Sequence, residues 1–184
     1  MKKLGLFLFL LLFSLESCAF KEEVKDFTQF VNPFIGTDGT GHTFPGACLP
    51  FGMVQPSPDN VDIGWDYTSG YQYKNPEILG FSQTHLSGTG INDLGDVLLL
   101  PFVENKTENF KTGYNKKTEK ASPGLYSVTL NDSIKVNLTA TERVAFNQFI
   151  YATNKAKLLV DIQHGLRFLT DSLVLDSKVT IENK

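Results

Sequence analysis

The segment around the single tryptophan of the chain holds the residue types that a carbohydrate site needs. Trp65 is followed directly by Asp66 in the sequence Gly64-Trp65-Asp66-Tyr67. An indole offers an apolar platform for the face of a pyranose, and a carboxylate accepts directional hydrogen bonds from sugar hydroxyls. A lone tryptophan is equally typical of a buried core, so the pattern leaves both interpretations open.

A second polar cluster runs from Gly80 to Gly90 and contains His85, Ser87 and Thr89. It lacks the third glycine and the following helix of a dinucleotide-binding motif. The neighbouring serine, histidine and aspartate side chains do not form a catalytic triad by pattern, because no serine lies in a nucleophile elbow. The carboxylates between Asn92 and Asp96 could bind calcium, but their spacing is not that of an EF-hand and is more typical of a turn.

A third cluster, rich in glycine and proline, extends from Asn32 to Met53. Glycine and proline fix a convoluted backbone, and such loops often position functional groups. These glycines are nevertheless more often required by the turn than by a ligand.

Short strands must position these clusters. Val24 to Asn92 shows no helical period, and its aromatic residues favour ordered loops with short strands over a linker. Val97 to Leu100 predicts a buried strand that ends at Pro101, and Lys106 to Lys120 indicates a solvated loop. Alternation on either side of Asn131-Asp132-Ser133 predicts a hairpin formed by Tyr126 to Leu130 and Ile134 to Ala140. Further strands are expected at Val144 to Tyr151, Leu158 to Ile162, Leu173 to Leu175 and Val179 to Ile181.

This succession of short strands predicts an all-β fold, an antiparallel β-sandwich. The strand pattern continues almost to the last residue, so we expect the sandwich to be incomplete at the C-terminus and poorly soluble by itself. The formal net charge of -3 and the lack of a basic tract argue against a nucleic-acid partner.

The N-terminus has the features of an export signal. Two lysines precede the apolar run Leu4 to Phe13, which is shorter than the ~20 residues of a membrane span. Leu15-Glu16-Ser17-Cys18 resembles a bacterial lipobox, which predicts lipid attachment at Cys18; an ordinary signal peptide without lipid is the alternative. Cys48 then has no partner for an intramolecular disulfide. We expect a signal peptide at 1–17, a tether at 18–29 and the β-sandwich at 30–184.

In their order along the chain, these clusters resemble the N-terminal domain of glycoside hydrolase family 92, bacterial exo-acting α-mannosidases. The resemblance implies a β-sandwich packed on a larger (α/α)-barrel catalytic domain, with the active site in the cleft between them. It also implies inversion of configuration and a calcium ion in the complete enzyme. The segments that carry the resemblance are Val31 to Thr37, Phe44 to Ala47, Gly64 to Tyr67, Gly80 to Gly90 and Leu138 to Val144.

The resemblance assigns Trp65 as the platform beside the leaving-group sugar, with Asp66, His85, Ser87 and Thr89 lining or bracing the same loops. In the family, the catalytic carboxylates and the calcium ligands belong to the C-terminal domain. None is therefore expected here, and the chain alone should have no catalytic activity. The implied partners are mannose-containing glycans, the missing catalytic domain and, through the lipid anchor, the outer membrane, where the protein could face outward. A free-standing lipid-anchored glycan-binding domain and an adhesin-like module are the alternatives.

Overall fold

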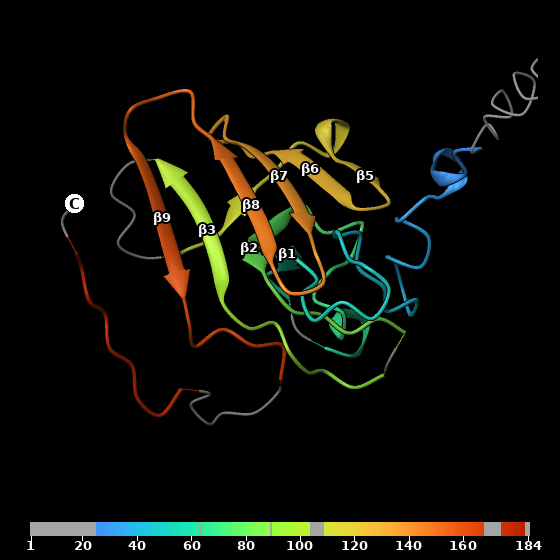
Figure 1. Cartoon of the computed structure of the whole chain (residues 1–184), viewed down its shortest axis with the longest axis horizontal. Coiled ribbons are helices and arrows are strands. Elements are labelled where there is room, and N and C mark those ends of the chain that lie inside the picture. The colour runs from blue at the N-terminus through green and yellow to red at the C-terminus, as the bar shows by residue number, and fades with distance from the viewer. Residues whose placement is uncertain (1–24, 63, 89, 104–108, 168–173, 183–184) are drawn as a thin grey trace, which may run out of the picture.

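Two antiparallel β-sheets make up the fold in the computed structural model, which describes residues 25–62, 64–88, 90–103, 109–167 and 174–182 (Figure 1). The prediction of an all-β antiparallel sandwich is confirmed. In the first sheet the strand order is β1 (Ser57–Asn60), β2 (Glu77–Ser82), β3 (Leu98–Val103) and β9 (Ala156–Asp161), and β4 (Thr112–Gly113) also pairs with β2. In the second sheet the order is β5 (Lys120–Ser122), β6 (Leu125–Thr129), β7 (Lys135–Ala140) and β8 (Ala145–Ile150).

The hairpin predicted from alternation is formed by β6 and β7. Tyr126 lies opposite Leu138 and Val128 opposite Val136. All four side chains are buried, because residues two apart on a strand point to the same face. This face meets the first sheet, where Phe81 of β2 contacts the ring of Tyr126. The core therefore lies between β2 and the β6–β7 hairpin.

The strand predicted at 97–100 extends past Pro101 to Val103, so its predicted end is wrong. Pro101 lies opposite Leu158 of β9, whereas the recorded pairing of β3 with β2 is at Leu99. A proline cannot donate a ladder hydrogen bond, and it is tolerated where a strand is paired on one side. The chain reaches β9 from β8 by crossing between the two sheets (Figure 1).

The prediction of a solvated loop at 106–120 is wrong for the described residues 109–120. They form β4, the short 3₁₀ turn η4 (Lys116–Thr118) and the start of β5. Glu119 is buried, and its carboxylate accepts hydrogen bonds from the hydroxyls of Tyr71 (2.8 Å) and Tyr126 (2.7 Å). Lys116 Nζ donates to the same carboxylate at 2.9 Å. The segment is thus tied to β6 and to the loop before β2 by polar contacts, which a local apolar pattern cannot predict.

The strands predicted near the C-terminus are not formed in the described part of that segment. Leu175, Val179 and Ile181 are strongly exposed and unassigned to any strand, and Leu173 lies outside the described residues. Alternation by itself does not make a strand, because strand hydrogen bonds need a neighbouring chain. Cys18 and the predicted signal peptide also lie outside the described residues. Within the described ranges no helix is long and apolar enough to span a membrane.

Candidate functional site

Trp65 projects from the surface while two other loops hold its ring. It begins the 3₁₀ turn η3 (Trp65–Tyr67), and 59% of its surface is exposed. The imidazole of His42 meets the indole edge to face, with ring centroids 5.0 Å apart. Gly90 lies so close that an added Cβ would overlap Cη2 of the indole. The indole is therefore a positioned surface ring, and the alternative of a core tryptophan is excluded.

The predicted neighbours of Trp65 lie on two loops around this ring. Asp66 is exposed, and its backbone carbonyl accepts a hydrogen bond from the side chain of Gln72. Ser87 is exposed on the second loop, where the N–H of Gly88 donates to the carbonyl of His42 at 2.6 Å. Thr89 lies outside the described residues. The fold thus brings the loops of Asp66 and Ser87 to the same indole.

His85 has a different environment, because its side chain is completely buried. Nδ1 lies 2.7 Å from the carbonyl oxygen of Gln55, and Nε2 lies 2.7 Å from Oδ1 of Asp59. Ser82 Oγ also lies 3.1 Å from Nε2, so both ring nitrogens have hydrogen-bond partners. His85 is placed to hold its loop against β1.

Asp59 is fully buried and binds a second histidine. Nε2 of His164 lies 2.7 Å from Oδ2, on the side opposite His85. Burial alone would raise the pKa of Asp59, but the charge of His85 and hydrogen bonds from both histidines hold that pKa well below its usual value. Burial likewise acts to lower the pKa of His164, but the hydrogen bond and charge of Asp59 outweigh it and the pKa is raised.

This buried His85–Asp59–His164 cluster touches the loop that carries the tryptophan. Gly70 has φ +81°, and a Cβ there would overlap Oδ1 of Asp59. The N–H of Gly70 donates to the carbonyl of Tyr67 at 2.9 Å, so the turn of Trp65 ends directly on the buried carboxylate. The cluster therefore contacts the chain directly after the turn that carries Trp65.

Sequence reasoning did not single out His42, Asp59 or His164. Asp59 and His164 are separated by 105 positions, and only the pairing of distant strands brings them together. His42 belongs to the glycine- and proline-rich cluster whose turns were considered structural. Its position beside the tryptophan cannot be predicted from the spacing of neighbouring residues in the sequence.

The described residues do not fit a calcium site. Among them, no group of three or more histidine, cysteine, aspartate or glutamate side chains could hold a metal ion. In the segment considered for calcium, Asp93 accepts hydrogen bonds from the N–H of Leu94 and from Arg167, and Asp96 accepts one from Thr84 at 2.7 Å. Each of these carboxylates is engaged with protein donors.

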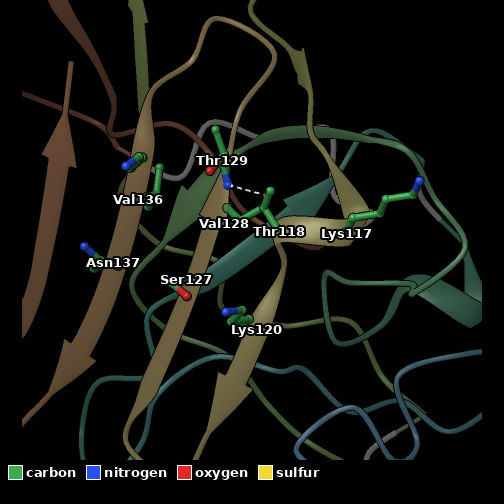
Figure 2. A pocket seen from close by; sticks show the side chains of 9 residues that line it. Lys117, Thr118, Lys120, Ser127, Val128, Thr129, Val136 and Asn137 are labelled. Atoms are coloured by element: carbon green, nitrogen blue, oxygen red, sulfur yellow. Dashed lines mark hydrogen bonds between the residues drawn. The ribbon is translucent and has the colours of Figure 1, made fainter. Parts of the chain in front are cut away.

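A separate open pocket lies on the second sheet, away from the predicted site residues. Its volume is about 320 Å³. Figure 2 shows that side chains of η4, β5, β6 and β7 line it, and that the N–H of Thr129 bonds to Thr118 Oγ1 at 3.0 Å. Its charged side chains, Lys117, Lys120 and Lys135, are exposed on the surface. Nothing in this pocket resembles the constellation around Trp65.

Comparison with known proteins connects this geometry to glycosidases. An α-mannosidase of family GH92 from Bacteroides thetaiotaomicron, also solved in complex with mannoimidazole, superposes with a TM-score of 0.74 and 40% identity, over 78% of this chain and 21% or 20% of that chain. The family GH92 inverting mannosidase of Bacteroides thetaiotaomicron VPI-5482 gives a TM-score of 0.65 and 27% identity, over 77% and 20%.

A curated relative, described as an uncharacterized secreted glycosidase of Arthroderma benhamiae, is 32% identical over 142 residues, which are 72% of this chain and 18% of the relative. The chain thus spans about a fifth of the length of these relatives. The model of the glycosyl hydrolase family 92 N-terminal domain matches residues 30–184. Because this match covers most of the chain, the protein belongs to the glycosyl hydrolase family 92 N-terminal domain family.

Proposed function

We propose that this chain is the sugar-binding β-sandwich portion of a calcium-dependent, inverting exo-α-mannosidase that acts on mannose-containing glycans. The observation that carries the proposal is the exposed indole of Trp65, fixed by His42 and Gly90 rather than buried in the core. A rigid aromatic ring at the surface gives a pyranose an apolar face to stack on at little cost in side-chain entropy.

The predicted site residues take two roles in this proposal. Asp66 and Ser87 supply polar groups around the platform, where they can bond to sugar hydroxyls, and the sequence assigns Thr89 to the same role. His85 supports the site without contacting the sugar, since its buried pair with Asp59 fixes the loop that carries Ser87. This division of roles follows the exposure of the described side chains.

Hydrolysis itself is proposed to need residues that correspond to the other four-fifths of the relatives. Inversion requires a general acid and a general base ~6.5–9.5 Å apart, with water between them. We assign both carboxylates and the calcium ligands to that larger domain, so that this chain alone binds glycans without cleaving them. Measurable release of mannose by the isolated chain would contradict this assignment.

The outward face of β9 is proposed to pack against that same polypeptide. Leu158 and Val160 are about half exposed, and Ile162 continues their line beyond the strand. Apolar patches of this kind mark interaction surfaces in soluble proteins. The proposed binding partner of this surface is the remainder of such a longer polypeptide, because the relatives are about five times longer and their remaining residues must contact this domain.

We further propose that Cys18 carries lipid and anchors the protein at the outer membrane, facing outward. A curated relative described as secreted supports a place of action outside the cytoplasm. Stable anchoring requires more than one acyl chain. Mass spectrometry of the membrane-extracted protein should find the acylated cysteine at the mature N-terminus; an unmodified cysteine would contradict the proposal.

The binding role is tested by replacing the indole. Trp65→Ala should weaken binding of methyl α-D-mannopyranoside, measured by isothermal titration or ligand-observed NMR, by about tenfold or more, equivalent to roughly 1.4 kcal/mol. Phe146→Ala is the matched control, because Phe146 is an aromatic residue with the same 59% exposure on β8. Equal affinity of both variants, or no affinity of the original chain, would overturn the proposal.

A further inference from the structure

His42 carries a buried nitrogen without a protein partner. The residue is 6% exposed, and within the described part of the chain no donor or acceptor reaches Nε2. Buried polar atoms in native proteins are nearly always hydrogen-bonded, and leaving one without a partner opposes folding. The unpaired nitrogen therefore calls for an explanation outside the described protein atoms.

The backbone of the same residue is strained. His42 has φ +54°, in the left-handed region that a residue with a side chain rarely adopts. The loop enforces this conformation: a Cβ on Gly41 would overlap the carbonyl of Gly36, and Gly88 donates to the carbonyl of His42 at 2.6 Å. Strain that the surroundings maintain is concentrated at functional sites.

Both unfavourable features occur next to the exposed indole. The imidazole stands at 79° to the ring of Trp65, with the centroids 5.0 Å apart. Ser57 Oγ and Asn147 Oδ1 are the other buried side-chain atoms without a partner in the described ranges. Ser57 belongs to β1 and Asn147 to β8, whereas His42 contacts the ring of Trp65.

We infer that His42 is a ligand-binding residue whose Nε2 forms a hydrogen bond with a hydroxyl of the sugar that stacks on Trp65. The inference rests on the proposed function and adds to it a specific polar contact. A neutral imidazole nitrogen can donate or accept according to its tautomer, and a sugar hydroxyl can do either in return. Nε2 is buried in the described structure, so this contact requires the surroundings of His42 to rearrange when the sugar binds.

The test uses two variants of the complete chain and its single tryptophan as reporter. His42→Phe keeps a ring against the indole and removes the nitrogen, whereas His42→Gln places an amide nitrogen near the position of Nε2. Titration with methyl α-D-mannopyranoside, followed by tryptophan fluorescence, should show about tenfold weaker binding for His42→Phe and partial recovery for His42→Gln. Thermal unfolding of His42→Phe should be unchanged or shifted upward.

Monodeoxy derivatives of the same glycoside identify the hydroxyl. One of them should bind the original chain and His42→Phe with the same affinity, since its missing hydroxyl is the partner of the missing nitrogen. If His42→Phe binds every probe as well as the original chain does, while Trp65→Ala abolishes binding in isothermal titration, the inference on His42 is wrong and the proposed function stands. If the original chain binds no probe, both are wrong. Loss of thermal stability in both His42 variants would indicate a packing role instead.

Discussion

At the scale of single residues, the indole of Trp65 can take its position only because residue 90 is a glycine. The backbone of Gly90 passes so close to the indole that a Cβ on this residue would overlap the ring. Trp65 is thereby fixed at its far edge, while His42 contacts the ring from another loop. Because the ring is held by its surroundings, little conformational freedom remains to be lost when a ligand binds.

Gly90→Ala should displace the indole. The added methyl group must push the ring or its own loop aside, which typically costs ~1–3 kcal/mol of unfolding free energy. We expect an altered tryptophan emission spectrum and weaker binding of methyl α-D-mannopyranoside. Gly88→Ala is the matched control: its φ of +72° makes alanine costly by ~1–2 kcal/mol, but the added carbon contacts no atom and should leave the emission unchanged. Identical emission spectra for both variants would contradict this account.

At the scale of elements, β1 is a short strand buried at every position although three of its four residues are polar. Its carboxylate is compensated by two histidines, and Asn60 bonds to the carbonyl of Glu77 at 2.8 Å. Buried charges are tolerated when they are paired and hydrogen-bonded. β1 therefore connects the loop of His85 with the segment after β9, and the turn of Trp65 lies on this connection.

The Asp59–His164 pair predicts how stability depends on pH. The lowered pKa of Asp59 gives stabilisation that is complete above its unfolded pKa, ~3.9, and is lost as the pH falls through the folded pKa. The raised pKa of His164 gives stabilisation that is complete below its unfolded pKa, ~6.5, and is lost as the pH rises through the folded pKa. Their combined contribution should be largest between about pH 4 and pH 6.5.

Urea unfolding across this range provides the measurement. The midpoint should fall on the alkaline side in the original chain, and His164→Gln should remove that fall. Asp38→Asn is the control, because Asp38 pairs with the highly exposed Lys74. It should change stability little, and the loss of stability at alkaline pH should remain. If the urea midpoint of His164→Gln falls at alkaline pH as it does in the original chain, the buried histidine is not the cause of the fall.

At the scale of the whole molecule, the two sheets differ in how well their faces are covered. The inner faces of β2, β6 and β7 form a closed core. β9 lies at the edge of the first sheet (Figure 1). Leu158 and Val160 on its outward face remain about half exposed. A β-sandwich with this surface can fold around its own core and still present apolar area to another polypeptide.

Replacing Leu158 and Val160 together by lysine should make the chain more soluble. Both side chains are already half in water, so the change in unfolding free energy should be small, about 1 kcal/mol or less, while light scattering at high concentration should fall. Leu159→Lys is the control, since that side chain points to the opposite, better covered face of β9 and its charge should destabilise the fold. Unchanged light scattering of the double variant would argue against β9 as a surface through which the chain self-associates.

The sequence alone determined the features that depend on local period and residue type. Alternation with a period of two placed the β6–β7 hairpin and its buried face, and the indole next to a carboxylate located the candidate sugar platform. These signals are local, because neighbouring residues on a strand point to opposite faces whatever the rest of the chain does. The same rule misled at Val179 and Ile181, where alternation exists without a partner strand.

Only the tertiary structure decided which polar groups meet. His85 was predicted at the site, but its burial against Asp59 depends on the pairing of β1 with β2. The approach of His164 from 105 positions away depends on the pairing of β3 with β9. The exposure of Trp65 and the unpaired nitrogen of His42 likewise result from three loops meeting. Electrostatic and steric contacts between distant segments leave no periodic trace in the sequence, because the chain between them can vary without changing the contact.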